Sequence, residues 1–107
     1  MMQEQVRERS NAWLTRQIEL PEQDGLHMRS AQRIVQTACR YDSEVRATKD
    51  SVEVNAKSLV DMIEFAAYVM SKDSEEDNGF HFRAQGTDAA DVLEALDVLV
   101  NQPCGLD

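Results

Sequence analysis

The chain has 107 residues, a length that favours one domain with a single hydrophobic core. Its 20 acidic and 11 basic residues give a net charge of -9 at pH 7, which argues against nucleic acid or an anionic membrane as a partner. The start of the chain is polar and there is no apolar run of about 18 residues, so we expect the chain to be neither secreted nor inserted into a membrane. Cys39 and Cys104 are widely separated and are expected to be free thiols in a reducing cytosol.

The first element predicted along the chain is a strand, because residues 13–20 alternate between apolar and polar side chains with few exceptions. Pro21 and Gly25 then mark a loop. The next apolar residues recur three and four positions apart, a spacing typical of a helix with one buried face. The residues of this stripe are Ala31, Ile34, Val35, Ala38 and Cys39.

Two short strand-like runs, SEVRAT and SVEVNA, predict a hairpin joined at Lys49-Asp50. Ser58 then precedes a second helix, expected over Leu59–Met70, with Asp61 placed three residues on as in a capping box. After a polar loop, FHFRA predicts a fourth strand, and Asp88 is expected to cap the last helix. The apolar stripe of that helix is Ala89, Val92, Leu93, Leu96, Leu99 and Val100.

The predicted order is therefore strand, helix, strand, strand, helix, strand, helix. Four short strands with all helices on one face form a two-layer α+β domain. Such a fold hosts many unrelated functions, so the fold class alone does not identify any chemistry.

The second predicted helix is apolar around nearly its whole circumference, with only two charged residues between positions 59 and 70. One stripe, consisting of Met62, Phe65, Ala66 and Val69, is expected to face the sheet. This leaves Leu59, Val60 and Ile63 as a surplus apolar patch, and exposed patches of this kind usually mark a docking surface. The alternative is that the acidic loop from Ser71 to Gly79 folds back and covers them.

The charges are distributed unevenly. From Gly25 to Tyr41 there is no acidic residue but there are three arginines, Arg29, Arg33 and Arg40, whereas no basic residue follows Arg83. A positive island on an acidic protein suits attraction of an anionic ligand or an acidic partner. The alternative is that the arginines form the solvated face of a helix.

His27 stands directly before the first predicted helix, in the segment GLHMRSAQRIVQTA. The free backbone N–H groups and the positive end of the helix dipole make such a position favourable for phosphate. Arg29 can add a charge-assisted contact to phosphate oxygens, and a neutral imidazole has a nitrogen lone pair for attack on phosphorus. On residue types alone, His27 remains a candidate helix cap, core residue, metal ligand or nucleophile.

Three segments together decide between these alternatives. GLHMRSA, followed by VNAKSLVDMI and later by GTDAADVLEALDVLV, resembles the histidine-containing phosphocarrier (HPr) family of the bacterial phosphotransferase system, from about Leu14 to Val100. The resemblance implies an open-faced sandwich in which three helices cover one face of a four-stranded antiparallel sheet. It also implies that His27 accepts a phosphoryl group from phosphorylated enzyme I and passes it to an acceptor protein, with help from Arg29 and without a cofactor or metal.

By the same resemblance, Ser58 matches the serine that a dedicated HPr kinase phosphorylates in many members of the family. The family docks its partners through the first helix and the residues that follow this serine, which is where Leu59, Val60 and Ile63 lie. Met28 is expected to be exposed beside His27 and to contact partners as well. The expected partners are therefore enzyme I, downstream phosphoryl acceptors and a serine kinase, in the cytoplasm.

The chain also departs from the family pattern. Ser30 replaces the usual proline; this first-turn position tolerates the change, and its hydroxyl is a candidate extra donor at the phosphate site. The loop from Ser71 to Gly79 is longer and more acidic than usual. We expect residues 1–12 to be a polar N-terminal extension, residues 13–102 the HPr-like domain and residues 103–107 a C-terminal tail.

The sequence thus predicts a phosphoryl carrier rather than an enzyme, because it lacks a glycine-rich phosphate loop and a ligand-spaced set of Cys and His residues. The second hypothesis is an HPr-like regulatory module that docks partners through the apolar patch without carrying phosphate. His81 alternates with two phenylalanines and is expected to be a surface residue. The acidic residues of the last helix are expected to form a solvated face and not a metal site.

Overall fold

The computed structural model describes residues 12–19, 28–69 and 79–101. Within these ranges the order of strands and helices is the predicted one. The elements are β1 (Leu14–Glu19), α2 (Met28–Ala38), β2 (Glu44–Lys49), β3 (Val52–Asn55), α3 (Leu59–Val69), β4 (Gly79–Gln85) and α4 (Ala89–Asn101). Leu20, Pro21, Gly25, Met70, Cys104 and the acidic loop preceding β4 lie outside the described residues.

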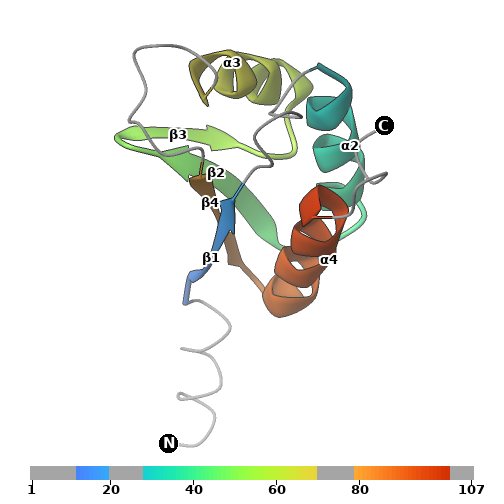
Figure 1. The fold of residues 1–107 in the computed structure, drawn as a ribbon. Coiled ribbons are helices and arrows are strands. Elements are labelled where there is room, and N and C mark those ends of the chain that lie inside the picture. Colours follow the sequence, from blue (N-terminus) through green and yellow to red (C-terminus); the bar gives the residue numbers. More distant parts are fainter. Residues whose placement is uncertain (1–11, 20–27, 70–78, 102–107) are drawn as a thin grey trace, which may run out of the picture.

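The four strands form one antiparallel sheet in the order β1-β4-β2-β3. All three helices lie on the same side of this sheet (Figure 1). Helix α4 packs on β1 and β4, α3 packs on β3 and β2, and α2 lies against both of these helices. The predicted α+β class, an open-faced two-layer sandwich, is confirmed.

Alternation along the strands creates the buried face of the sheet. In β4, Phe80, Phe82 and Ala84 are buried, whereas His81 and Arg83 are half-exposed on the other face, as expected for His81. The rings of Phe80 and Phe82 meet edge to face at 5.0 Å, and Phe80 meets Phe65 of α3 at 5.5 Å. The contact between Phe65 and Phe80 joins the sheet to the helical layer.

The predicted buried stripes of the helices are largely confirmed. The four expected residues of α3 are buried, and so is the expected stripe of α4 apart from the half-buried Leu99. The expectation for Cys39 is wrong, because its free thiol is exposed. Helix α2 ends at Ala38, and the chain then turns, so Cys39 leaves the buried face. At the other end of α2, Ser30 is buried instead.

The β2–β3 hairpin turns one residue later than expected. Lys49 still pairs with Val52, so Asp50 and Ser51 form the two-residue turn. Asp50 has a φ of 56°, in the left-handed region that aspartate tolerates better than most residues. Lys49 is buried, and its ammonium donates a hydrogen bond of 2.9 Å to the carbonyl oxygen of Gly79 in β4. This bond keeps Lys49 within the sheet.

Asp88 precedes α4 as expected, but its carboxylate contacts a distant segment. It accepts hydrogen bonds of 2.9 Å from the backbone N–H groups of Asp42 and Ser43, and it also accepts one from the Ser43 hydroxyl. The hydroxyl and the Asp42 N–H lower the pKa of Asp88 below its usual range. The prediction of a simple helix cap is therefore corrected, because the carboxylate joins the loop before α4 to the loop after α2.

Gly86 makes this junction sterically feasible. Its φ is 147°, and a Cβ atom at this position would lie 2.4 Å from the Ser43 hydroxyl oxygen and 2.8 Å from the Ser43 Cα. Only glycine combines that backbone conformation with so close an approach. The two loops therefore meet through Gly86 and Asp88 on one side and Ser43 on the other.

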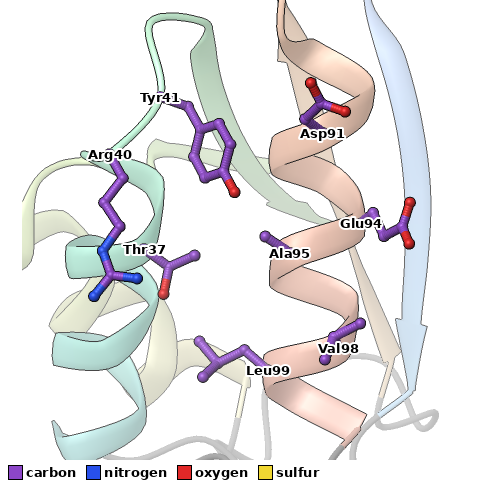
Figure 2. Close-up of a pocket in the computed structure, with 8 residues that line it drawn as sticks. All are labelled: Thr37, Arg40, Tyr41, Asp91, Glu94, Ala95, Val98 and Leu99. Atoms are coloured by element: carbon purple, nitrogen blue, oxygen red, sulfur yellow. The ribbon is translucent and has the colours of Figure 1, made fainter.

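Helices α2 and α4 enclose an open hollow between them (Figure 2). Tyr41, just after α2, and Leu99 of α4 point into the space between the two helices. The hollow therefore lies on the helical side of the sandwich, at the end of α2 that is farther from His27 in the sequence.

Candidate functional site

The candidate phosphoryl site is at the N-terminal end of α2. The helix begins at Met28, directly after His27 in the sequence, and its first turn contains no acidic residue. His27 itself and the Met28 side chain lie outside the described part of the chain. The first N–H groups of a helix lack intrahelical acceptors and carry its partial positive charge, so this end of α2 favours an anion.

Arg29 and Arg33 extend this positive character along α2. Both side chains are exposed and stand four residues apart, hence on one face of the helix, and Arg40 is exposed just beyond its end. An exposed guanidinium at the second residue of the helix is free to move toward an anion at the helix start. Arg29 is thus exposed in the first turn of α2, and its role at a phosphoryl group remains a prediction.

Ser30 lies in the same first turn but faces the interior. Its side chain is fully buried, and its hydroxyl has no hydrogen-bond partner. The hydroxyl therefore points into the fold rather than toward the surface that carries Arg29. Its predicted contribution of a donor to bound phosphate remains a prediction.

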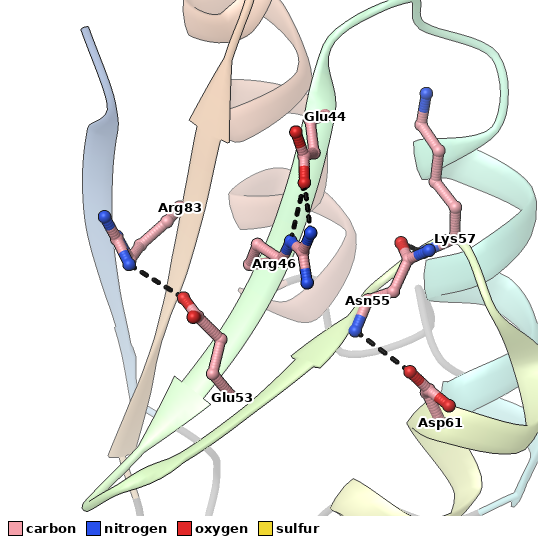
Figure 3. A network of polar contacts seen from close by, with 7 residues as sticks. All are labelled: Glu44, Arg46, Glu53, Asn55, Lys57, Asp61 and Arg83. Atoms are coloured by element: carbon pink, nitrogen blue, oxygen red, sulfur yellow. Dashed lines mark hydrogen bonds and ion pairs between the residues drawn. The ribbon is translucent and has the colours of Figure 1, made fainter.

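The second candidate site, Ser58, is the N-cap of α3, as predicted. Its hydroxyl oxygen accepts a hydrogen bond of 3.3 Å from the Asp61 N–H. The Asp61 carboxylate does not complete a standard capping box but accepts a hydrogen bond of 3.2 Å from the Asn55 N–H (Figure 3). The Asn55 side chain in turn accepts a hydrogen bond of 2.9 Å from the Lys57 N–H. The turn before α3 is thus organised by its own residues.

Lys57 connects this turn to the end of α2. Its ammonium donates a hydrogen bond of 2.6 Å to the Tyr41 carbonyl oxygen, and its own carbonyl oxygen lies 3.7 Å from the Cys39 sulfur. The Lys57 charge is thereby placed at the negative end of the α2 dipole. The roles of Asn55, Lys57 and Tyr41 were not predicted from the sequence. Asn55 and Lys57 nevertheless belong to the segment Asn-Ala-Lys-Ser, residues 55–58, which supports the resemblance.

The predicted apolar patch is present at the start of α3, but it is smaller than expected. Leu59 is 37% exposed and Val60 is 66% exposed, whereas Ile63 is half-buried and packs against the core. The exposed part of the patch is therefore formed mainly by Leu59 and Val60. The segment that was the alternative cover for the patch lies outside the described residues.

The acidic residues of α4 do not act as one group. Asp97 pairs with Arg16 of β1 at 2.9 Å, and Asp88, just before the helix, joins the two loops. Among the described residues, no group of three His, Cys, Asp or Glu side chains is arranged to hold a metal ion. Over the same three ranges, no helix is both long and apolar enough to cross a membrane.

The open face of the sheet is covered by paired charges. Arg83 of β4 contacts Glu53 of β3 at 2.7 Å, and Arg46 Nε donates a hydrogen bond of 2.9 Å to Glu44 on the same strand (Figure 3). Arg83 also lies over the ring of Trp13, 4.8 Å from its centroid. The charges on this face of the sheet are therefore largely compensated.

Known proteins are similar to this chain in both fold and sequence. A family profile described as "PTS HPr component phosphorylation site" matches residues 14–102. The phosphocarrier protein HPr of Neisseria meningitidis serogroup A is 32% identical over 88 residues, which cover 82% of this chain and 91% of the relative. The crystal structure of a phosphocarrier protein HPr from Bacillus anthracis has a TM-score of 0.69 and 28% identity, covering 85% of this chain and all of the other.

A further similar structure is that of Crh from Bacillus subtilis, described as a catabolite repression containing protein. It has a TM-score of 0.55 and 34% identity, and the match covers 76% of this chain and 85% of Crh. The fold and the family match define a small α+β phosphocarrier domain. The chain belongs to the HPr family, the phosphocarrier proteins of the phosphotransferase system. Proteins of this family are carriers that interact with other components of that system and are not themselves catalysts.

Proposed function

We propose that this chain accepts a phosphoryl group on His27 from phosphorylated enzyme I and passes it to an acceptor protein. The observation that carries the proposal is the start of α2 at Met28, directly after His27, with an exposed Arg29 and no acidic residue in the first turn. A histidine at this position adjoins free amides and a guanidinium, which favour a phosphoryl group.

The proposed transfer needs only a few groups of the chain. The neutral imidazole nitrogen attacks phosphorus, a P–N bond forms, and the bond between phosphorus and its donor breaks. Amides at the start of α2 and Arg29 stabilise the charge on the phosphoryl oxygens. The acceptor's nucleophile then displaces the imidazole, which returns to its neutral form. No cofactor or metal enters this sequence, and we expect it to occur in the cytoplasm.

The proposed docking surface extends from the start of α2 to the start of α3, which lies near the other end of α2. It consists of Met28, Leu59 and Val60, with a smaller contribution from the half-buried Ile63. Exposed leucine and valine on the same helical layer as the phosphoryl carrier site provide contact area for enzyme I and for an acceptor protein. The arginines of α2 favour acidic partner surfaces.

We further propose that an HPr serine kinase phosphorylates Ser58 to regulate docking. The hydroxyl is half-buried and already accepts a hydrogen bond from the first turn of α3, where the helix dipole favours a phosphate. The modification adds nearly two negative charges beside Leu59 and Val60. It should therefore weaken binding to acidic surfaces such as that expected of enzyme I.

The second candidate function is a regulatory module that docks partners through Leu59, Val60 and Ile63 without carrying phosphate. It is favoured by the 34% identity to Crh, which is described as a catabolite repression containing protein. This candidate retains the Ser58 surface and makes no use of the His27 imidazole.

One assay separates the two candidates. The full chain is incubated with phosphoenolpyruvate and an enzyme I shown to phosphorylate a reference HPr, and an acid-labile phosphoryl adduct is then sought by mass spectrometry. We expect an adduct on the wild type and on the matched control His81→Ala, but none on His27→Ala. A wild type without an adduct favours the regulatory module, and an adduct that persists in His27→Ala refutes the assignment of His27.

A further inference from the structure

The hollow between α2 and α4 has a volume of about 740 Å³ and opens to solvent. Its lining combines apolar and charged side chains, and Figure 2 shows that residues of both helices face it. The residues that matter here are Arg40 and Tyr41 on the α2 side, and Asp91, Glu94, Val98 and Leu99 on the α4 side.

The interior of the hollow is apolar where the helices come together. Tyr41 and Leu99 are half-buried and point between the helices, and Val98, which is 47% exposed, also lines the hollow. Val98 is one of four large apolar residues exposed in the described ranges, and two of the others belong to the proposed docking surface at α3. An exposed valine beside a hollow can be covered by an apolar side chain of a ligand.

The α4 side of the hollow carries two carboxylates, whereas the α2 side carries one guanidinium, that of Arg40. Asp91 and Glu94 are exposed, and neither makes an ion pair with any residue in the described part of the chain. This distinguishes them from Asp97, which is paired with Arg16, and from Asp88, which is bonded to Ser43. The chain has no basic residue after Arg83, so α4 itself supplies no compensating charge.

These features select one kind of occupant. An open hollow buries little of a small molecule, and a second copy of the chain would bring another acidic α4 and a further net charge of -9. An anionic membrane is repelled for the same reason. A basic helix with one apolar face matches both the apolar interior and the acidic α4 side, and a groove between two helices is a common seat for such a helix.

We propose that the hollow between α2 and α4 docks a basic amphipathic helix of a partner protein. Lysines or arginines of that helix pair with Asp91 and Glu94, while its apolar side chains cover Val98 and Leu99. The hollow is at the C-terminal end of α2, and the proposal does not rest on phosphoryl transfer.

The probe is a designed amphipathic peptide of roughly 18 residues, about five helical turns, with leucines on one face and lysines on the other. It is titrated into the full ¹⁵N-labelled chain at low salt, and a peptide with glutamate in place of lysine is the control. We expect the lysine peptide to shift the amide signals of residues 37–41 and 91–99 saturably, with affinity falling as salt screens the charges. The glutamate peptide should cause no such shifts.

Two matched pairs of variants make the test specific. Glu94→Gln and Glu64→Gln each remove one charge from an exposed helical glutamate, and only Glu94→Gln should weaken peptide binding, by about threefold. Val98→Ser and Val60→Ser each shorten an exposed valine, and only Val98→Ser should weaken binding, by about fivefold. The amide spectrum of each free variant shows whether its fold is intact.

Three results would overturn the proposal. Equal weakening by Glu94→Gln and Glu64→Gln, or shifts scattered over the whole surface, would show unspecific attraction to an acidic protein. Shifts of the same amides on raising the concentration of the free chain would identify a second copy as the occupant. Nuclear Overhauser contacts from Val98 or Leu99 to residues 102–107 in the free chain would show that the hollow is already filled from within.

Discussion

Helices α3 and α4 each start after a polar residue, but the two starts are held in different ways. Ser58 bonds to the first turn of its own helix, and the other contacts of that turn come from Asn55 and Lys57 next to it. Asp88 instead reaches Asp42 and Ser43, more than forty positions earlier in the chain. The cap of α3 is thus formed by neighbouring residues, with one longer-range bond from Lys57 to Tyr41, whereas the Asp88 carboxylate before α4 bonds to a distant loop.

This difference predicts how far the effect of a substitution at each helix start should extend through the fold. A change at Ser58 removes one local bond, and the helix can fray by a residue without disturbing the sheet. A change at the junction of Gly86, Asp88 and Ser43 separates two loops that connect the helical layer to β2 and β4. We therefore expect the larger losses of stability on the α4 side.

The largest effect is expected for Gly86→Ala. The new methyl group would overlap Ser43, and alanine is strained at a φ of 147°. We expect the free energy of unfolding to fall by about 3 kcal/mol, measured by urea denaturation. Adding Ser43→Ala should restore only part of this loss, because the contact with the Ser43 Cα remains. A loss below about 1 kcal/mol would mean that the loops adjust freely.

Asp88→Asn should follow, with a loss of about 2 kcal/mol at neutral pH, because it removes the charge from several hydrogen bonds. The pKa of Asp88 is lowered in the folded chain, so its carboxylate stabilises the fold above the unfolded pKa of about 3.9. This contribution disappears as the pH falls through the lower pKa of the folded state. Urea denaturation from pH 7 to pH 2 should therefore show wild type and variant converging in acid; a constant difference would contradict the mechanism.

Ser58→Ala should cost less, about 1 kcal/mol, because it removes a single N-cap contact. Ser58→Thr keeps a capping hydroxyl and should lose only a few tenths of a kcal/mol. Amide hydrogen exchange resolves where the loss falls. We expect faster exchange in the first turn of α3 and unchanged protection in β4. Faster exchange throughout the chain would contradict the conclusion that the cap of α3 acts locally.

The smallest effect on stability is expected for Val60→Ser, since Val60 is 66% exposed. The free energy of unfolding should change by less than about 0.5 kcal/mol. The rate of phosphoryl transfer from enzyme I should nevertheless fall several-fold, as a stopped-flow or quench assay can show, because the side chain belongs to the proposed docking surface. Val98→Ser is the matched control, and equal slowing by both variants would argue against a specific role for the start of α3.

The parts of the fold that could be predicted from the sequence are those set by periodicity and by local contacts. The buried faces of α3 and α4 follow from apolar residues three and four positions apart, and Ser58 acts on a residue only three positions away. Three contacts could not be predicted in this way: the hydrogen bonds from Ser43 to the Asp88 carboxylate, the Arg16–Asp97 ion pair and the Lys57–Tyr41 hydrogen bond. Each of them joins residues that only the tertiary fold brings together.

The candidate sites show the same division. The helix start after His27 and the cap at Ser58 could be located from pattern and resemblance, because both are properties of a few consecutive residues. The burial of Ser30 and the reduced exposure of Ile63 depend on how α2 and α3 rotate against the core. The exposure of Cys39 depends on where α2 ends. Sequence periodicity gives a face of a helix but not its exact angle to a neighbour.

The strand order has a consequence for how the nascent chain folds during translation. Leu14 of β1 pairs with Ala84 of β4, and β4 also separates β1 from β2. While the ribosome is still making the segment before β4, the first strand has no hydrogen-bonding neighbour, and only the β2–β3 hairpin and its adjacent helices can assemble. We expect the sheet to close late in translation, so a ribosome stalled before β4 should expose a protease-sensitive amino-terminal segment that becomes resistant once β4 and α4 have emerged.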